Sequence, residues 1–161
     1  MAVTYSLSPP PDVLFGSATT AAGPMYEIRT GPTDYALISR IGLRLINAVG
    51  SPVSTIGIGV PAARGSGIQV SYPLISESPQ VDGNGLTLAM GWGIPPTVPT
   101  TFLRRYSCLT GAATNESQLH LPIFNFRWGY KLLPSSSLVI WLILSGQATV
   151  ASEFTDLEIS V

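Results

Sequence analysis

The sequence predicts an all-β fold, an antiparallel two-sheet sandwich that is jelly-roll-like and has about nine strands. Short apolar runs alternate with polar residues at a period of two, which is typical of half-buried strands. The 16 Gly and 14 Pro of the chain separate these runs with turn signals. No repeat of fixed period is present in the sequence, which excludes propellers and solenoids.

Residues 1–24 are expected to form an extended N-terminal arm, and residues 25–161 the sandwich domain. The stretch Ser8 to Pro11 favours a polyproline conformation, and much of the remaining arm is small and polar. Val13, Leu14 and Phe15 differ, because an apolar triplet in such a segment suggests docking on the arm's own domain or on a neighbour. A frayed terminus is the alternative.

The first predicted strand covers residues 26–30, and its apolar residues Tyr26 and Ile28 fall on one face. Glu27 and Arg29 alternate with them. We therefore expect a half-buried strand whose charged side chains lie on the face away from the core.

The second strand is expected at residues 37–45. Leu37 and Ile41 share one of its faces, together with the leucines that follow. Arg40 and Arg44 share the opposite face, which places two guanidinium groups side by side.

The third strand is expected at residues 56–60, where apolar residues alternate with Gly57 and Gly59. Two glycines leave its outer face without side chains. Another backbone or sheet can therefore come close to this face.

The remaining strands are expected at residues 68–72, 86–92, 102–109, 119–127, 138–144 and 149–161. One short helix is expected at most, around residues 112–119. Trp92 should share a face with Leu88 and Met90, because all three have the same parity. Pro122 interrupts its run and argues for an edge or a bulge, because proline cannot donate to a ladder.

The last two strands carry distinct patterns. The unbroken apolar run over residues 138–144 predicts a central strand that is buried on both faces. In the C-terminal strand the apolar parity changes between Phe154 and Leu157. This change predicts a bulge near Thr155 or Asp156.

The composition points to a chain that packs against neighbours. Charged residues make up 11% of it, whereas a soluble domain usually has about 25%. Lys131 is the only lysine, and arginine tolerates interfaces better than lysine, although a GC-rich genome produces the same bias. Arg104 and Arg105 put one charge on each face of their strand, so one must be paired, at an edge or in an interface. The candidate intersubunit contacts are Arg29, Arg40, Arg44, Arg104 and Arg105, with Leu14 and Phe15 as anchors of the arm.

Several partners and activities are not expected. The net charge is −1, and the basic residues do not form a block in the sequence. The chain therefore lacks the positively charged patch to which nucleic acid binds. The longest apolar run is far shorter than the roughly 20 residues of a membrane span, and the N-terminus lacks a secretion signal. His120 has no Asp or Glu at the spacing of a catalytic motif. A thiolate pair of Cys108 with His120 is the weaker alternative, because both residues are expected to be structural. We therefore predict no enzyme, no cofactor and no metal.

Four stretches together resemble short virion proteins of tailed bacteriophages and prophages: Tyr26 to Gly31, Gly57 to Ala63, Pro99 to Arg105 and Leu133 to Trp141. The resemblance covers most of residues 26–145. It implies a small β-sandwich of the capsid decoration, or cement, type on the outer surface of the virion. Such proteins often bind as trimers across junctions of the major capsid protein, and their arms reach along the lattice.

The first hypothesis is therefore a homotrimeric decoration subunit that stabilises a phage head, assembled in the host cytoplasm, with the major capsid protein or other virion subunits as partners. The alternative is a trimeric receptor- or glycan-binding head of a phage tail or fibre, for which exposed tryptophans such as Trp128 would be needed. A shell-forming capsid subunit of a small virus is weaker, because the chain has no basic arm for a genome.

Overall fold

The computed structural model describes residues 5–6, 22–46, 53–73, 75–76, 86–109, 119–120, 124–145 and 151–160, and these contain strands and no helix. The strands are β1 (Tyr5–Ser6), β2 (Gly23–Arg29), β3 (Ala36–Ile46), β4 (Val53–Gly59), β5 (Ser66–Pro73), β6 (Ile75–Ser76), β7 (Thr87–Ile94), β8 (Phe102–Leu109), β9 (Leu119–His120), β10 (Phe124–Leu132), β11 (Ser137–Ser145) and β12 (Ala151–Ser160). Nine of these strands have seven or more residues, and they correspond in order to the nine predicted.

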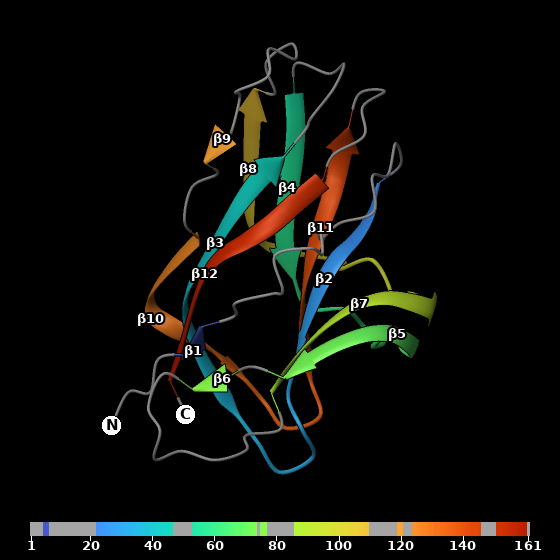
Figure 1. The fold of residues 1–161 in the computed structure, drawn as a ribbon, viewed down its shortest axis with the longest axis vertical. Coiled ribbons are helices and arrows are strands. Elements are labelled where there is room, and N and C mark those ends of the chain that lie inside the picture. Colours follow the sequence, from blue (N-terminus) through green and yellow to red (C-terminus); the bar gives the residue numbers. More distant parts are fainter. Residues whose placement is uncertain are drawn as a thin grey trace.

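The strands form two facing antiparallel sheets, which confirms the predicted sandwich (Figure 1). One sheet has six strands in the order β5-β7-β2-β11-β4-β8. The other has the order β10-β3-β12, with β9 also pairing with β3. The order β2-β11-β4-β8 interleaves early and late strands, as Greek-key sandwiches and jelly rolls do. A separate two-residue pairing joins β1 to β6.

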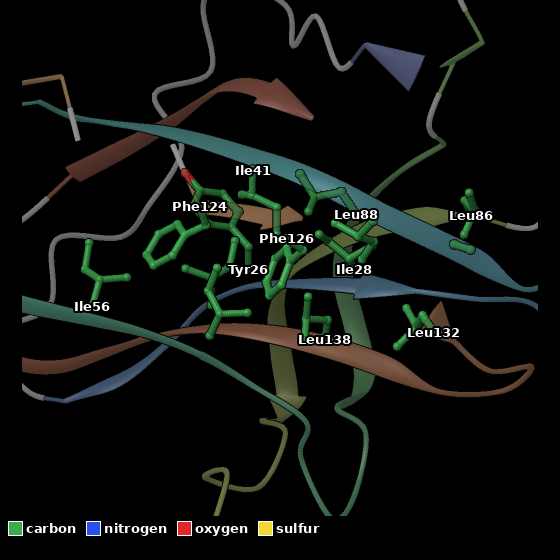
Figure 2. Packing of buried hydrophobic residues seen from close by; sticks show 14 of the residues in the cluster. Tyr26, Ile28, Ile41, Ile56, Leu86, Leu88, Phe124, Phe126, Leu132 and Leu138 are labelled. Carbon is green, nitrogen blue, oxygen red and sulfur yellow. The ribbon is translucent and has the colours of Figure 1, made fainter. Parts of the chain in front are cut away.

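The core lies between the two sheets. Figure 2 shows Phe124 and Phe126 of β10 facing Tyr26 and Leu138 of the six-stranded sheet. The fully enclosed side chains at the centre include the alternating residues that the sequence placed on the inner faces of β2 and β4. Burial of each such side chain stabilises the fold by about 1.5–3 kcal/mol relative to exposure.

Two C-terminal predictions are confirmed. Strand β11 is central, between β2 and β4, and Leu138, Val139 and Ile140 are buried in succession, so both of its faces are covered. In β12 the register shifts between Phe154 and Asp156, where the parity change predicted a bulge.

The glycine face of β4 is covered by side chains of its own domain. A Cβ added at Gly57 would lie 2.5 Å from the Phe102 ring, and one at Gly59 would lie 2.6 Å from Pro99. The close approach that these glycines predicted therefore occurs, and side chains from β8 and the segment before it make it.

Two loops form a further layer over the outer face of the six-stranded sheet. We call residues 60–65 and 95–101 the loop layer. The backbone N–H of Thr97 donates to the Ala63 carbonyl at 3.0 Å, and the N–H of Ala63 donates to the Thr97 hydroxyl at 2.9 Å. Gly65 N–H reaches the Glu27 carboxylate at 3.4 Å, which ties the layer to β2.

The prediction that Glu27 lies on a solvent face is wrong. Its carboxylate is 0% exposed, because the loop layer covers this part of the sheet. The prediction that Trp92 shares a face with Leu88 and Met90 is also wrong. Its indole N–H donates to Glu27, which lies on the opposite face of the sheet. Gly91 has φ +63° and changes the strand's parity before Trp92.

The predicted pairing of Leu37 with Ile41 on one face is also wrong. The buried residues of β3 are Ala36, Ile38 and Ile41, so the parity changes between Ile38 and Ile41. Ile38 and Arg40 pair with two consecutive residues of β12, so Ser39 between them is the extra residue of a bulge and changes the parity. A bulge of this kind leaves Leu37 on the outer side.

Several predictions fall outside the described residues. These include Leu14 and Phe15, most of the arm at residues 1–24, and the short helix at residues 112–119. Strand β2 begins at Gly23, close to the expected start of the domain.

Candidate interaction surface

The edge strands of the two sheets meet along one side of the sandwich. Strand β8 is the last strand of the six-stranded sheet, and β10 lies beside β3 at the margin of the other (Figure 1). The Arg104 guanidinium lies 5.6 Å from the centroid of the Phe126 ring and so joins the two edges. This cation–π contact places a charge at the opening of the core.

A large bulge projects from β10 on this side. From the Arg40–Asn125 pair to the Ile38–Tyr130 pair, β10 advances five residues while β3 advances two. Gly129 has φ +72°, which suits a sharp change of backbone direction. The chain between these pairs therefore leaves the ladder.

The bulge presents Trp128 to solvent. Its side chain is 81% exposed, whereas Phe126 within the same bulge is 8% exposed and packs in the core. Arg127 stacks on the indole, with its guanidinium 5.1 Å from the ring centroid. Phe126 anchors the bulge and Trp128 stands out from it.

Strand β8 adds further exposed groups. The Arg105 guanidinium lies 5.1 Å from the centroid of the Phe102 ring, on the outer face of the sheet. Tyr106 is 39% exposed and pairs with Ile56 of β4. We call the set Arg104, Arg105, Tyr106, Arg127 and Trp128 the β8–β10 edge.

The β8–β10 edge has the chemistry of a protein-binding surface. Trp, Tyr and Arg are the residue types that dominate binding hot spots. Its arginines are preorganised because aromatic rings fix their guanidinium groups, which reduces the entropy lost on binding. The edge strand β8 also has one side without a neighbouring strand among the described residues, and such an edge is able to pair with another chain.

Only two of the predicted intersubunit arginines lie on this surface. Arg104 and Arg105 are at the sheet edge, one of the positions that the sequence allowed for them. Arg40 and Arg44 lie on β3, where the register sets Glu158 opposite Arg40 and Glu153 opposite Arg44. Strand β3 is an inner strand of its sheet, so these two arginines are not part of the β8–β10 edge.

Arg29 lies elsewhere, beneath the loop layer. It is half-buried on the same face as Glu27, and it pairs in register with Ser137 of β11. Arg64 of the loop layer is close by and donates from Nη2 to the Thr30 carbonyl at 3.2 Å. Burial lowers the pKa of the Arg64 guanidinium, neighbouring Arg29 lowers it further, and Glu27 opposes both.

Sequence reasoning missed Arg64, Arg127 and Tyr106 as surface groups. A glycine within a strand often marks a bulge, but the predicted strand ended at residue 127, so Gly129 was not recognised as such a signal. Arg64 carried no comparable signal, since its position depends on contacts with residues far along the chain.

Three further observations on the described residues concern metals, membrane-spanning helices and the pair Cys108 and His120. No group of three or more His, Cys, Asp or Glu within them is placed to hold a metal ion. Within the same residues, a helix of the length and apolarity that a membrane span requires is not found. Cys108 and His120 lie on strands of different sheets.

Comparisons of the chain with protein-family models, with curated proteins and with solved structures each found no match.

Proposed function

We propose that this chain is a non-enzymatic structural subunit of a tailed-phage particle, a decoration protein that binds the outside of the capsid and bridges neighbouring capsid subunits. The observation that carries the proposal is the β8–β10 edge, where an 81% exposed Trp128 stands beside ring-stacked arginines. The low charge of the chain and its resemblance to short phage virion proteins support the same role.

The physical role follows from linkage. A subunit that binds the assembled shell, but not its separated subunits, shifts the equilibrium toward the shell by mass action. The β8–β10 edge combines an exposed indole with ring-stacked arginines, and Trp and Arg are enriched in binding hot spots. We propose a homotrimer as the assembled form, because three copies offer three such edges to a junction of capsid subunits.

The test uses the full chain and capsids of the phage or prophage that encodes it. We expect the wild-type chain to sediment with capsids and to raise their heat-release temperature. Trp128→Ala should weaken capsid binding by about tenfold or more, because loss of a hot-spot side chain typically has this effect. Ile94→Ala is the matched control, since Ile94 is also highly exposed, at 68%, but lies outside the β8–β10 edge.

A monodisperse monomer that neither binds capsids nor changes their heat release would overturn the proposal. Equal losses from Ile94→Ala and Trp128→Ala would show that the β8–β10 edge is not the binding surface. Light scattering of the purified chain tests the homotrimer separately.

A receptor- or glycan-binding head of a tail or fibre is the second candidate. The exposure of Trp128 favours it, because an exposed indole is a platform on which a sugar ring packs. Arg127 stacks on the same indole, so one ring face has to accommodate both the cation and a ligand. A glycan-array signal that disappears in Trp128→Ala, with no capsid binding by the wild type, would establish this function instead.

A further inference from the structure

Three buried polar atoms near the loop layer have no hydrogen-bond partner among the described residues. They are Nη1 of Arg29, Nε of Arg64 and Oγ of Ser137. Folded proteins satisfy the large majority of their buried polar atoms, because an unpaired one loses its hydration without compensation. Several unpaired atoms at one place therefore point to a ligand that pairs with them.

The three side chains share one location. Ser137 lies directly opposite Arg29 in the antiparallel pair of β11 and β2, so the two side chains are on the same face. Arg64 enters from the loop layer and bonds the carbonyl of Thr30, the residue after Arg29. Ser137 is 2% exposed, and both arginines are half-buried, with the unpaired Nη1 of Arg29 and Nε of Arg64 themselves buried.

The charge of this location favours an anion. Two guanidinium groups are accompanied by the carboxylate of Glu27, whose oxygens already accept from Trp92 Nε1 at 3.0 Å and from Gly65 N–H at 3.4 Å. One positive charge is therefore in excess. Burial and mutual repulsion lower the pKa of Arg64, and a bound anion would relieve that repulsion.

We propose that Arg29, Arg64 and Ser137 form a binding site for a small oxyanion, either a phosphate-like ion or a carboxylate. The guanidinium groups supply N–H donors in a fixed planar arrangement that matches both kinds of anion, and the serine hydroxyl supplies a third donor. This site is separate from the β8–β10 edge, and its existence does not depend on the function proposed above.

The experiment titrates the full chain in a chloride buffer with inorganic phosphate, sulfate and acetate. Binding is followed by the melting temperature and by the Arg Nε–H signals in NMR spectra. We expect a saturable rise in melting temperature and shifts confined to the signals of Arg29 and Arg64. Arg64→Gln should weaken the binding by about tenfold or more, because it removes a charged donor. The matched control is Lys131→Gln, which removes an exposed positive charge from β10, outside both sites, and should leave binding unchanged.

A second variant guards against misfolding of the first. Ser137→Ala should weaken binding yet raise the melting temperature without added anion, because it removes an unpaired buried hydroxyl. Tighter binding of phosphate or sulfate than of acetate would identify a free phosphate-like ligand, and tighter binding of acetate a carboxylate donated by another molecule. Absence of a saturable response to all three ions, or equal losses in Arg64→Gln and Lys131→Gln, would overturn the proposal.

Discussion

The indole Nε1 of Trp92 donates a 3.0 Å hydrogen bond to Oε2 of Glu27, a carboxylate with 0% exposure. The positive φ of Gly91 turns Trp92 onto the face where Glu27 lies. Because Gly65 also donates to this carboxylate, one acidic residue ties β7 and the loop layer to β2. Glu27 is thus a structural element of the outer face.

Trp92→Phe should destabilise the fold by about 1–3 kcal/mol, the cost of leaving a buried acceptor without its donor. The phenyl ring retains most of the packing, so the loss is specific to the N–H group. Urea unfolding followed by circular dichroism measures the change. Trp128→Phe is the control, and an equal effect in the two variants would contradict the role of the Glu27 bond.

Gly65→Ala should destabilise the chain by about 1–3 kcal/mol through overpacking. A Cβ at this buried position would lie 2.2 Å from Cδ1 of Trp92, and the indole is held by Glu27 and has little freedom to retreat. Gly93→Ala is the matched control, because its Cβ would meet no atom nearer than 3.7 Å. Thermal unfolding of both variants checks the prediction, which fails if Gly65→Ala melts with Gly93→Ala.

Local patterns were enough to predict the nine long strands and two features of the C-terminal ones. The apolar run at residues 138–144 predicted a central strand, and β11 is that strand. The change of parity between Phe154 and Leu157 predicted the bulge in β12 within one or two residues. These features depend on side-chain alternation along one strand, which a single sequence records directly.

The outer face and the candidate site were less predictable, because they depend on contacts between distant residues. Glu27 is 65 residues from the indole that bonds it, and nothing in the alternation of β2 reports the loop layer. The proximity of Arg64 to Arg29 also depends on contacts between residues that are distant in the sequence. The position of Arg104 and Arg105 at a sheet edge was among those predicted, because adjacent charges on opposite faces of a strand require an edge or a partner.

Trp128→Ala should leave the free energy of unfolding within about 0.5 kcal/mol of the wild type, because surface side chains contribute little to stability. The side chain is 81% exposed, so the fold loses almost no buried area. Capsid binding should fall in the same variant. A variant that unfolds more easily and binds less would instead indicate a structural role, and urea titration separates the two outcomes.

Gly129→Ala should destabilise the fold by about 1–3 kcal/mol and weaken capsid binding, because it disturbs the bulge that presents Trp128. Gly129 has φ +72°, where an L side chain is strained, and its Cβ would lie 2.4 Å from Cγ of Leu37. The strain and the clash are separable with a second substitution.

Leu37→Ala removes the atoms that a Cβ at position 129 would meet, but it leaves the backbone strain in place. In that background we expect Gly129→Ala to cost about 1–2 kcal/mol, the strain alone. A double-mutant cycle from urea unfolding measures the difference as a coupling energy. Additive effects of the two substitutions would show that Leu37 does not pack against Gly129. A full restoration of capsid binding in the double variant would show that the clash, and not the left-handed backbone, decides how Trp128 is presented.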